Sequence, residues 1–330
     1  PDDATETEQL ISGAQEFASS CMTRSSDLLP YVSTIDTASD MDVLRRALNE
    51  EQISYMGFSY GTSLGATWAT LFPETVRAAV LDAAVDPTRG YVDDLILQAG
   101  GFEDSLNAFF IKCDASKCSF MKVGESAEDA FDRILLSLDQ NPIANDDDRA
   151  VTNQGIAQTG IAGALYGDYQ WPQLENALSA ADIGDGQPLL ILFDEYFGRD
   201  SAGQTDNSID AYFGISCLDR DQNLTNDQVF DLTDELTSVA PRLWPGWIQE
   251  MLICANWEVE PQGGITIGAE TENRIVVVGS TGDAATPLEG TRNMVVALGQ
   301  ARLVISPLEQ HTTYGTDTCV TKIVDDYLLN

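Results

Sequence analysis

The strongest constraint on the fold is a change of hydrophobic period near residue 53. Residues 1–49 have a helical pattern with no credible strand. Ile53-Ser54-Tyr55-Met56 then predicts a short strand, a helix of small residues follows as far as Phe72, and Val76 to Ala84 predicts a second, buried strand. A helix between two apolar strands is a βαβ unit, which implies a parallel sheet. The chain is therefore predicted to be an α/β protein.

The second helix of the N-terminal region has a predicted start in the sequence. Thr37 has the character of an N-cap, and Asp40 stands three residues later in the capping-box position. Met41, Leu44 and Leu48 then recur at helical spacing. We therefore expect a helix that begins after Thr37 and lines one face with these three side chains.

The sheet signal disappears over the middle of the chain and returns near its end. Helical segments such as 127–138 and 171–181 occupy the middle, which predicts a mainly helical cap over the sheet. The later part predicts, in order, a strand, a helix, a second strand and a helix: 274–279, 288–298, 301–305 and 319–329. The predicted division is the first part of the sheet core in 1–86, the helical cap insertion in 87–272, and the rest of the core in 273–330.

Composition excludes several classes of protein. The 330 residues include 53 Asp and Glu against 17 Lys and Arg, which gives a formal net charge of -36. Such a charge repels nucleic-acid phosphates and anionic membrane surfaces, so we expect no nucleic-acid partner. A hydrophobic content of 43% excludes an acidic disordered chain. No apolar run approaches the length that a membrane span requires.

Gly57-Phe58-Ser59-Tyr60-Gly61 joins the first predicted strand to its helix. The pattern G-x-S-x-G is weak evidence alone, but a strand-to-helix turn is where the nucleophile elbow of an α/β-hydrolase lies. Glycines leave room for the tight turn, which presents the Ser59 hydroxyl. The Tyr60 backbone N–H then lies at the helix N-terminus, where it can stabilise an oxyanion. A plain glycine-rich turn is the alternative interpretation.

A serine nucleophile needs a base, and His311 is the one histidine in the sequence. It follows a predicted strand near the end of the chain, as the order Ser, acid, His requires. Asp283 follows the preceding strand and is predicted to orient the imidazole. Asp82 and Asp86, after the earlier strand, are the competing acids. The alternative for His311 is an ordinary surface histidine.

These segments together resemble a known family. GFSYGTSLGATWATLFPETVRAAVLDAAVDP, then GDAATPLEGT, then a late His followed by a Cys, are similar to the secreted tripeptidyl-aminopeptidases of actinobacteria. Those proteins are α/β-hydrolase serine peptidases related to prolyl aminopeptidases. The resemblance implies Ser59 as nucleophile, Asp283 as acid and His311 as base. It also implies release of short peptides from a free N-terminus, without a metal or organic cofactor.

The cysteines fit an exported, disulfide-bonded protein. They are too dispersed for a zinc knuckle, and one histidine cannot complete a His-containing metal site. With the resemblance in view, Cys113 is expected to pair with Cys118, and Cys217 with Cys254 inside the cap. Cys21 and Cys319 remain, either for each other or for cysteines outside this chain. A cytosolic protein with buried free thiols is the alternative.

The front of the fold gives a further expectation. An α/β-hydrolase has several strands before its elbow and a glycine-rich loop that donates a second oxyanion N–H. Only 58 residues precede Ser59, and none of them resembles that loop. We therefore expect the N-terminal strands to be missing from this chain and supplied by an associated fragment or a second chain. A truncated chain or a minimal fold is the alternative.

Recognition of a substrate amine calls for carboxylates in the cap. The candidates lie near apolar or aromatic residues: Asp168, Asp219, Glu250 and Glu258, with Trp257 as a side-chain pocket residue. Packing in the core of the cap is the favoured role for most of the cap tryptophans. The favoured function is a secreted serine exopeptidase acting on peptide substrates. A carboxylesterase or lipase with the same triad is one alternative, and a non-catalytic hydrolase-like binding or surface protein is another.

Overall fold

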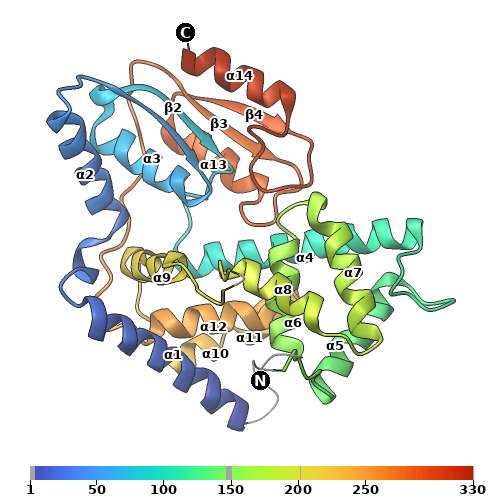
Figure 1. Ribbon diagram of the computed structural model, residues 1–330. Helices are drawn as coiled ribbons and strands as arrows, with labels where there is room; N and C mark the ends of the chain where they lie inside the picture. The colour runs from blue at the N-terminus through green and yellow to red at the C-terminus, as the bar shows by residue number, and fades with distance from the viewer. Residues whose placement is uncertain (1–3, 146–150, 201, 330) are drawn as a thin grey trace.

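Four strands form one parallel sheet at the upper end of the molecule in Figure 1. The computed structural model describes residues 4–145, 151–200 and 202–329. Within them the strands pair side by side in the order β1-β2-β3-β4. Their bounds are β1 (Ile53–Phe58), β2 (Val76–Asp82), β3 (Ile275–Ser280) and β4 (Ala301–Ser306). The predicted βαβ unit and the predicted return of the sheet after the cap are confirmed.

Helices cover both faces of this sheet. Side chains alternate along β3, so Ile275 and Val277 pack into the core of α2, α3 and α13, whereas Val276 and Val278 pack against α14. This alternation explains the unbroken apolar run, because a strand buried on both faces needs apolar residues at every position. The four helices are α2 (Thr34–Ala47), α3 (Tyr60–Leu71), α13 (Leu288–Leu298) and α14 (Thr318–Leu329).

The predicted start of α2 is wrong. The N-cap is Ser33, whose hydroxyl accepts a hydrogen bond from the Asp36 backbone N–H at 3.1 Å. Ser33 and Asp36 have the same spacing as Thr37 and Asp40, one turn earlier, and the helix uses the earlier pair. Ala38 is wholly buried on the side of α2 that packs against α3. Leu44 and Leu48 are 59% and 63% exposed, so two of the three residues predicted to line the buried face do not.

The described residues of the segment 87–272, called the cap, form helices joined by loops, with isolated β-bridges between some of the loops. Its helices form the layer below the sheet in Figure 1. Across 4–145, 151–200 and 202–329, none of the helices is both long and apolar enough to cross a membrane. The cap helices are α4 (Tyr91–Ser116), α5 (Ala127–Gln140), α6 (Gln154–Ala164), α7 (Trp171–Asp182), α8 (Gln187–Tyr196), α9 (Ser208–Asp219), α10 (Asn226–Phe230), α11 (Thr233–Val239) and α12 (Trp244–Ala255). The short 3-10 turns of the chain are η1 (Leu29–Tyr31), η2 (Pro73–Thr75) and η3 (Asp168–Gln170).

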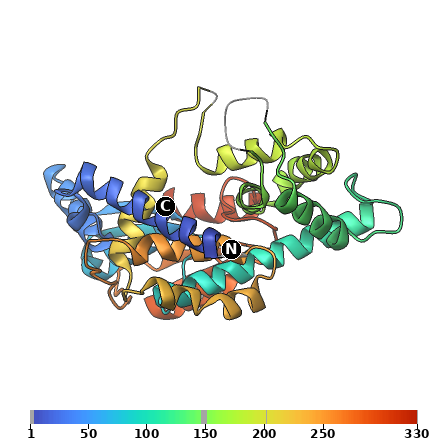
Figure 2. The same cartoon turned by 90° about the horizontal axis from the view of Figure 1, so that it is seen from below.

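The first helix, α1 (Ala4–Ser25), packs with the cap helices rather than with the sheet. Its buried face, with Ala14 and Ala18, lies in one apolar core with residues of α9 and α12. The Phe17 and Phe213 rings meet edge to face with centroids 5.3 Å apart. Figure 2 shows α1 crossing the helical layer in the view from below. The division at residues 86 and 272 stays a prediction.

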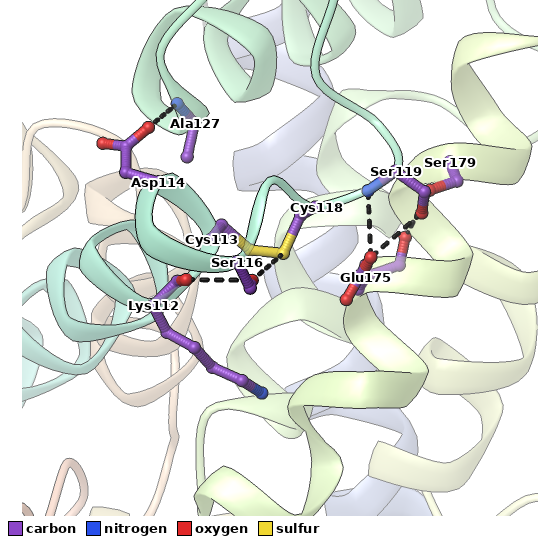
Figure 3. The surroundings of a disulfide bond; sticks show 9 residues. All are labelled: Lys112, Cys113, Asp114, Ser116, Cys118, Ser119, Ala127, Glu175 and Ser179. Atoms are coloured by element: carbon purple, nitrogen blue, oxygen red, sulfur yellow. Dashed lines mark hydrogen bonds between the residues drawn. A yellow bond between two sulfur atoms is a disulfide. The ribbon is translucent and has the colours of Figure 1, made fainter.

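Two disulfides brace the cap as expected. Cys113 and Cys118 close a short loop after α4 (Figure 3), and Cys217 and Cys254 join α9 to α12. Cys21 and Cys319 are free thiols, so their pairing with each other is wrong. They belong to α1 and α14, which lie at opposite ends of the molecule in Figure 1. The Cys21 sulfur instead lies 3.9 Å from an Asp210 carboxylate oxygen.

The two disulfides should differ in what they contribute to stability. Cys217 and Cys254 are 37 residues apart and Cys113 and Cys118 only 5, so the first closes the longer loop in the unfolded chain. Replacing the first pair by alanine should lower the free energy of unfolding by about 4 kcal/mol, and replacing the second by about 2 kcal/mol. Urea denaturation of both double variants measures this. Equal losses in the free energy of unfolding, or a larger loss in the Cys113 and Cys118 variant, would contradict the loop-length argument.

Candidate active site

Ser59 lies in the turn between β1 and α3 with φ of 53° and ψ of -123°. A positive φ on a residue other than glycine costs about 1–3 kcal/mol and persists only where the surroundings enforce it. The Ser59 N–H donates to the Asp82 carbonyl oxygen at 3.0 Å. The Ser59 carbonyl oxygen accepts from the Thr62 N–H and, at 2.6 Å, from the Thr62 hydroxyl. These bonds hold a strained turn whose serine is half-exposed.

The glycines of the motif are needed because the turn is tight. A Cβ on Gly57 would lie 2.3 Å from the Gly61 carbonyl oxygen. One turn into α3, a Cβ on Gly65 would lie 2.4 Å from the Tyr55 ring. The Tyr55 hydroxyl donates to the same Gly61 oxygen at 2.6 Å. The predicted strand-to-helix elbow is therefore present, and β1 and α3 approach each other where they lack side chains.

Asp283 and His311 are hydrogen-bonded. The His311 Nδ1 lies 2.9 Å and 3.0 Å from the two Asp283 carboxylate oxygens. The carboxylate also accepts from the N–H groups of Ala285 and Thr286, and from the Thr286 hydroxyl at 2.9 Å. Because a carboxylate only accepts, Nδ1 carries the proton, and the other ring nitrogen, Nε2, is left as a hydrogen-bond acceptor. Asp283 side-chain atoms are fully buried, whereas His311 retains 9% exposure.

The cap holds the histidine loop through its backbone. The His311 N–H donates to the Tyr166 carbonyl oxygen at 2.7 Å, and the Asp168 N–H donates to the Glu309 carbonyl oxygen at 2.9 Å. Between these bonds, Gly167 and Gln310 form an antiparallel bridge. The Tyr166 ring also meets the imidazole edge to face, with centroids 5.5 Å apart. The position of His311 therefore depends on the cap as well as on the sheet.

Tyr60 is the first residue of α3, so its N–H belongs to the amides that a helix leaves unpaired at its N-terminus. Its side chain is held from the cap side. The Tyr60 hydroxyl lies 2.7 Å from the Thr34 hydroxyl, which donates to the Asp219 carboxylate. The Thr34 N–H donates to the same carboxylate at 2.9 Å. The C-terminal end of α9 is thus hydrogen-bonded to α2 and, through Thr34, to Tyr60 of the elbow.

Comparison with known proteins agrees with this geometry. Residues 241–330 match the family model described as TAP-like protein. The chain has the α/β-hydrolase fold and is related to the TAP-like proteins. It is 29% identical over 327 residues to the serine protease Hip1 of Mycobacterium tuberculosis, and 28% identical over 330 residues to the tripeptidyl aminopeptidase of Streptomyces lividans. It is also 30% identical over 349 residues to the carboxylesterase B of M. tuberculosis.

The matches cover most of this chain but only part of the length of each relative. They include 96%, 96% and 100% of this chain, and 63%, 59% and 64% of Hip1, the aminopeptidase and the carboxylesterase respectively. The chain therefore spans about three fifths of the length of these relatives. The comparisons give no support to the expectation that a separate N-terminal fragment or second chain completes the fold.

The five cap residues predicted to bind substrate lie in different surroundings. Asp219 is engaged with Thr34, and its pKa is raised by burial. Asp168 is exposed beside the histidine loop. Glu258 is exposed and lines a small surface hollow with residues of α1. Trp257 is 5% exposed in the apolar core of α1, α9 and α12. These four surroundings give the substrate-binding role no support, and it stays a prediction for them.

Glu250 is the candidate that interacts with tyrosines of the cap. It accepts a hydrogen bond from the Tyr212 hydroxyl. Burial, and then the nearby Tyr196 and the charge of Glu250, raise the pKa of Tyr166, whose ring contacts His311. Burial, and then the nearby charge of Asp94, raise the pKa of Glu250 itself to about 7. Burial raises the pKa of Asp94 to about 6. Two carboxyl groups with raised pKa values, Glu250 and Asp94, thus interact in the cap, and Glu250 also interacts with Tyr212 and Tyr166.

Sequence reasoning missed three residues of the site. Thr286 bonds the Asp283 carboxylate, and the spacing of three residues after an aspartate could have revealed it. Tyr166 contacts His311 only through the fold, with no local signal. Asp82 was considered only as a competing acid, but its carboxylate accepts the N–H groups of Thr313 and Tyr314. The other competitor, Asp86, bonds Thr88, Arg89 and Asn293.

The elbow should tolerate no side chain at Gly57. Gly57→Ala should lower the free energy of unfolding by about 1–3 kcal/mol, because the new Cβ meets the backbone of residue 61. The matched control is Gly13→Ala at an exposed position of α1, where a Cβ meets nothing within 4 Å. That change should stabilise the helix by up to about 1 kcal/mol. Urea denaturation measures both, and two effects of the same sign would contradict the close approach.

Proposed function

We propose that this chain is a serine hydrolase in which Ser59 is the nucleophile, His311 the base and Asp283 the acid. The strained elbow at Ser59 and the buried bond between Asp283 and His311 support this assignment. The chain order Ser, Asp, His and the position of each residue after a strand of one parallel sheet add to that support. The relation to a serine protease agrees with it.

The chemistry follows from these positions. Ser59 attacks the substrate carbonyl while His311 Nε2 takes the hydroxyl proton, and Asp283 stabilises the resulting imidazolium. The Tyr60 N–H, at the positive end of the α3 dipole, donates to the oxyanion. His311 then returns its proton to the leaving amine, and an acyl-enzyme forms on Ser59. Water, deprotonated by the same nitrogen, releases the acyl group.

The proposed substrates are short peptides with a free N-terminus. The observation that carries this proposal is Glu250, a cap carboxyl group with a pKa of about 7 that accepts a hydrogen bond from Tyr212 and interacts electrostatically with Tyr166, whose ring contacts His311. A substrate ammonium beside Glu250 favours its charged form and forms a charge-assisted hydrogen bond. Cleavage of tripeptidyl or prolyl type is the finer proposal, which the resemblance and the relation to the Streptomyces aminopeptidase support.

A carboxylesterase is the second candidate. The triad serves an ester as well as a peptide, and a relative at 30% identity is a carboxylesterase. We propose a secreted or cell-envelope location for either activity. The two disulfides support that location, because such bonds persist in oxidising compartments.

Ser59 should react with a fluorophosphonate probe, which traps activated serines. We expect labelling of the native protein, none in Ser59→Ala, and at least about a 10³-fold slower reaction in His311→Ala, because the base is lost. Intact mass and peptide mapping locate the label. Labelling at another serine, or equal labelling of His311→Ala, would contradict the assigned triad.

Amine recognition predicts that N-acetylation of a peptide substrate slows its cleavage. In Glu250→Gln, kcat/KM for the free peptide should fall about 10–100-fold, because one charge-assisted bond is lost, with little change for the acetylated peptide. Glu8→Gln, which neutralises an exposed acid on α1, is the control. An equal fall in kcat/KM for both peptides would show that Glu250 does not bind the substrate amine. Faster turnover of esters than of any peptide would favour the esterase.

The preference for a free amine should depend on pH. Glu250, with a pKa of about 7, is neutral at lower pH and becomes a carboxylate as the pH rises through that value. The ratio of kcat/KM for free over acetylated peptide should therefore rise through about pH 7. It should fall again above about pH 8, where the substrate amine loses its proton. A ratio independent of pH in the native protein would contradict this role.

A further inference from the structure

Asp82, the last residue of β2, contacts both the elbow and the histidine loop. Its backbone carbonyl oxygen accepts the Ser59 N–H at 3.0 Å. Its carboxylate Oδ2 accepts the N–H groups of Thr313 at 3.0 Å and Tyr314 at 2.7 Å. The side chain is wholly buried. One residue therefore bonds the nucleophile turn through its main chain and the segment just after His311 through its side chain.

The backbone around Asp82 is strained at three places. Ser59, Ala83 and Thr312 have φ values of 53°, 64° and 63°, although none is a glycine. Ser59 is the residue whose N–H Asp82 accepts, Ala83 follows Asp82, and Thr312 stands between His311 and the first amide that the carboxylate binds. Conformations of this kind persist only where surrounding bonds over-determine them.

We propose that Asp82 is a positioning residue that sets the placement of His311 relative to Ser59. This inference rests on the proposed function of those two residues. The carboxylate closes the turn after His311 and holds Thr312 in its left-handed conformation. The carbonyl oxygen fixes the serine turn on the neighbouring strand. Rigid β2 thus joins the two reacting side chains by a path independent of the Asp283 bond.

The position requires a hydrogen-bond acceptor. Both backbone N–H groups bond the same carboxylate oxygen, Oδ2, and the Thr313 hydroxyl lies 3.5 Å from Oδ1. An asparagine can still offer its one oxygen to both amides, whereas an alanine removes the acceptor. Asp82 is also not a second acid for His311, because Oδ2 binds the two amides, Oδ1 faces the Thr313 hydroxyl, and the His311 Nδ1 lies at Asp283. Burial raises the pKa of Asp82, and the two amide bonds favour its charged form.

The test compares Asp82→Ala with Asp86→Ala in the same protein. Asp86 is a buried carboxylate that follows the same strand, but its hydrogen bonds go to Thr88, Arg89 and Asn293, none of which belongs to the elbow or the histidine loop. In Asp82→Ala, fluorophosphonate labelling of Ser59 should slow about 10–100-fold, because both amide bonds are lost and small misplacements of reacting groups cost rates of that order. Asp86→Ala should label at the native rate even where it lowers stability.

Proton NMR supplies a readout that lost stability alone does not move. His311 is the one histidine in the sequence, so its Nδ1–H and ring C–H signals need no further assignment. In folded Asp82→Ala these signals should shift or broaden, whereas those of Asp86→Ala should match the native protein. If Asp82→Ala does not fold, Asp82→Ser carries the same expectation, because its oxygen stands where the Asp82 Cγ does and is too far from the two amides.

The outcomes separate this inference from the proposed function. Native labelling rates and native His311 signals in the folded Asp82 variant would overturn the positioning role and leave the triad in place. Equal losses in the Asp82 and Asp86 variants would also overturn it, because they would show a general effect of removing a buried charge. If the native protein itself fails to label at Ser59, the proposed function fails. The NMR comparison then still decides whether Asp82 holds His311.

Discussion

Parallel pairing of the four strands is the constraint on which the candidate site depends. Because parallel strands all end at one edge of a sheet, the segments that follow them meet there. Ser59 follows β1, Asp82 ends β2, Asp283 follows β3, and His311 lies in the loop after β4. More than two hundred residues separate the elbow from the acid, yet the register of one sheet brings their loops to the same edge.

The cap shares this edge through hydrogen bonds rather than through apolar contact alone. The segment around Tyr166 bonds the backbone of the histidine loop, and Asp219 at the end of α9 bonds Thr34, which reaches the Tyr60 side chain. A cap joined in this way positions reacting groups as well as covering them. It also holds Glu250, which gives the cap a direct part in the proposed choice of substrate.

Periodic features were predictable, and contacts between distant segments were not. The four strands, their positions along the chain and the elbow follow from hydrophobic period and from glycines at fixed spacing, and all were predicted. The start of α2 was not, because Ser33 and Thr37 carry the same local signal. The exposure of Leu44, Asp168 and Glu258 depends on which segments pack nearby, which no local pattern encodes.

By itself, the sequence determined that a parallel βαβ unit presents a serine in a tight turn, and that any histidine base must be His311. It left three aspartates as candidates for the acid. Only the tertiary structure decided among them. Asp283 reaches Nδ1, whereas Asp82 is taken by the amides of Thr313 and Tyr314, and Asp86 by Thr88, Arg89 and Asn293. The physical reason is that each carboxylate is bound by the donors that folding brings within hydrogen-bonding distance, and those donors come from other strands and loops.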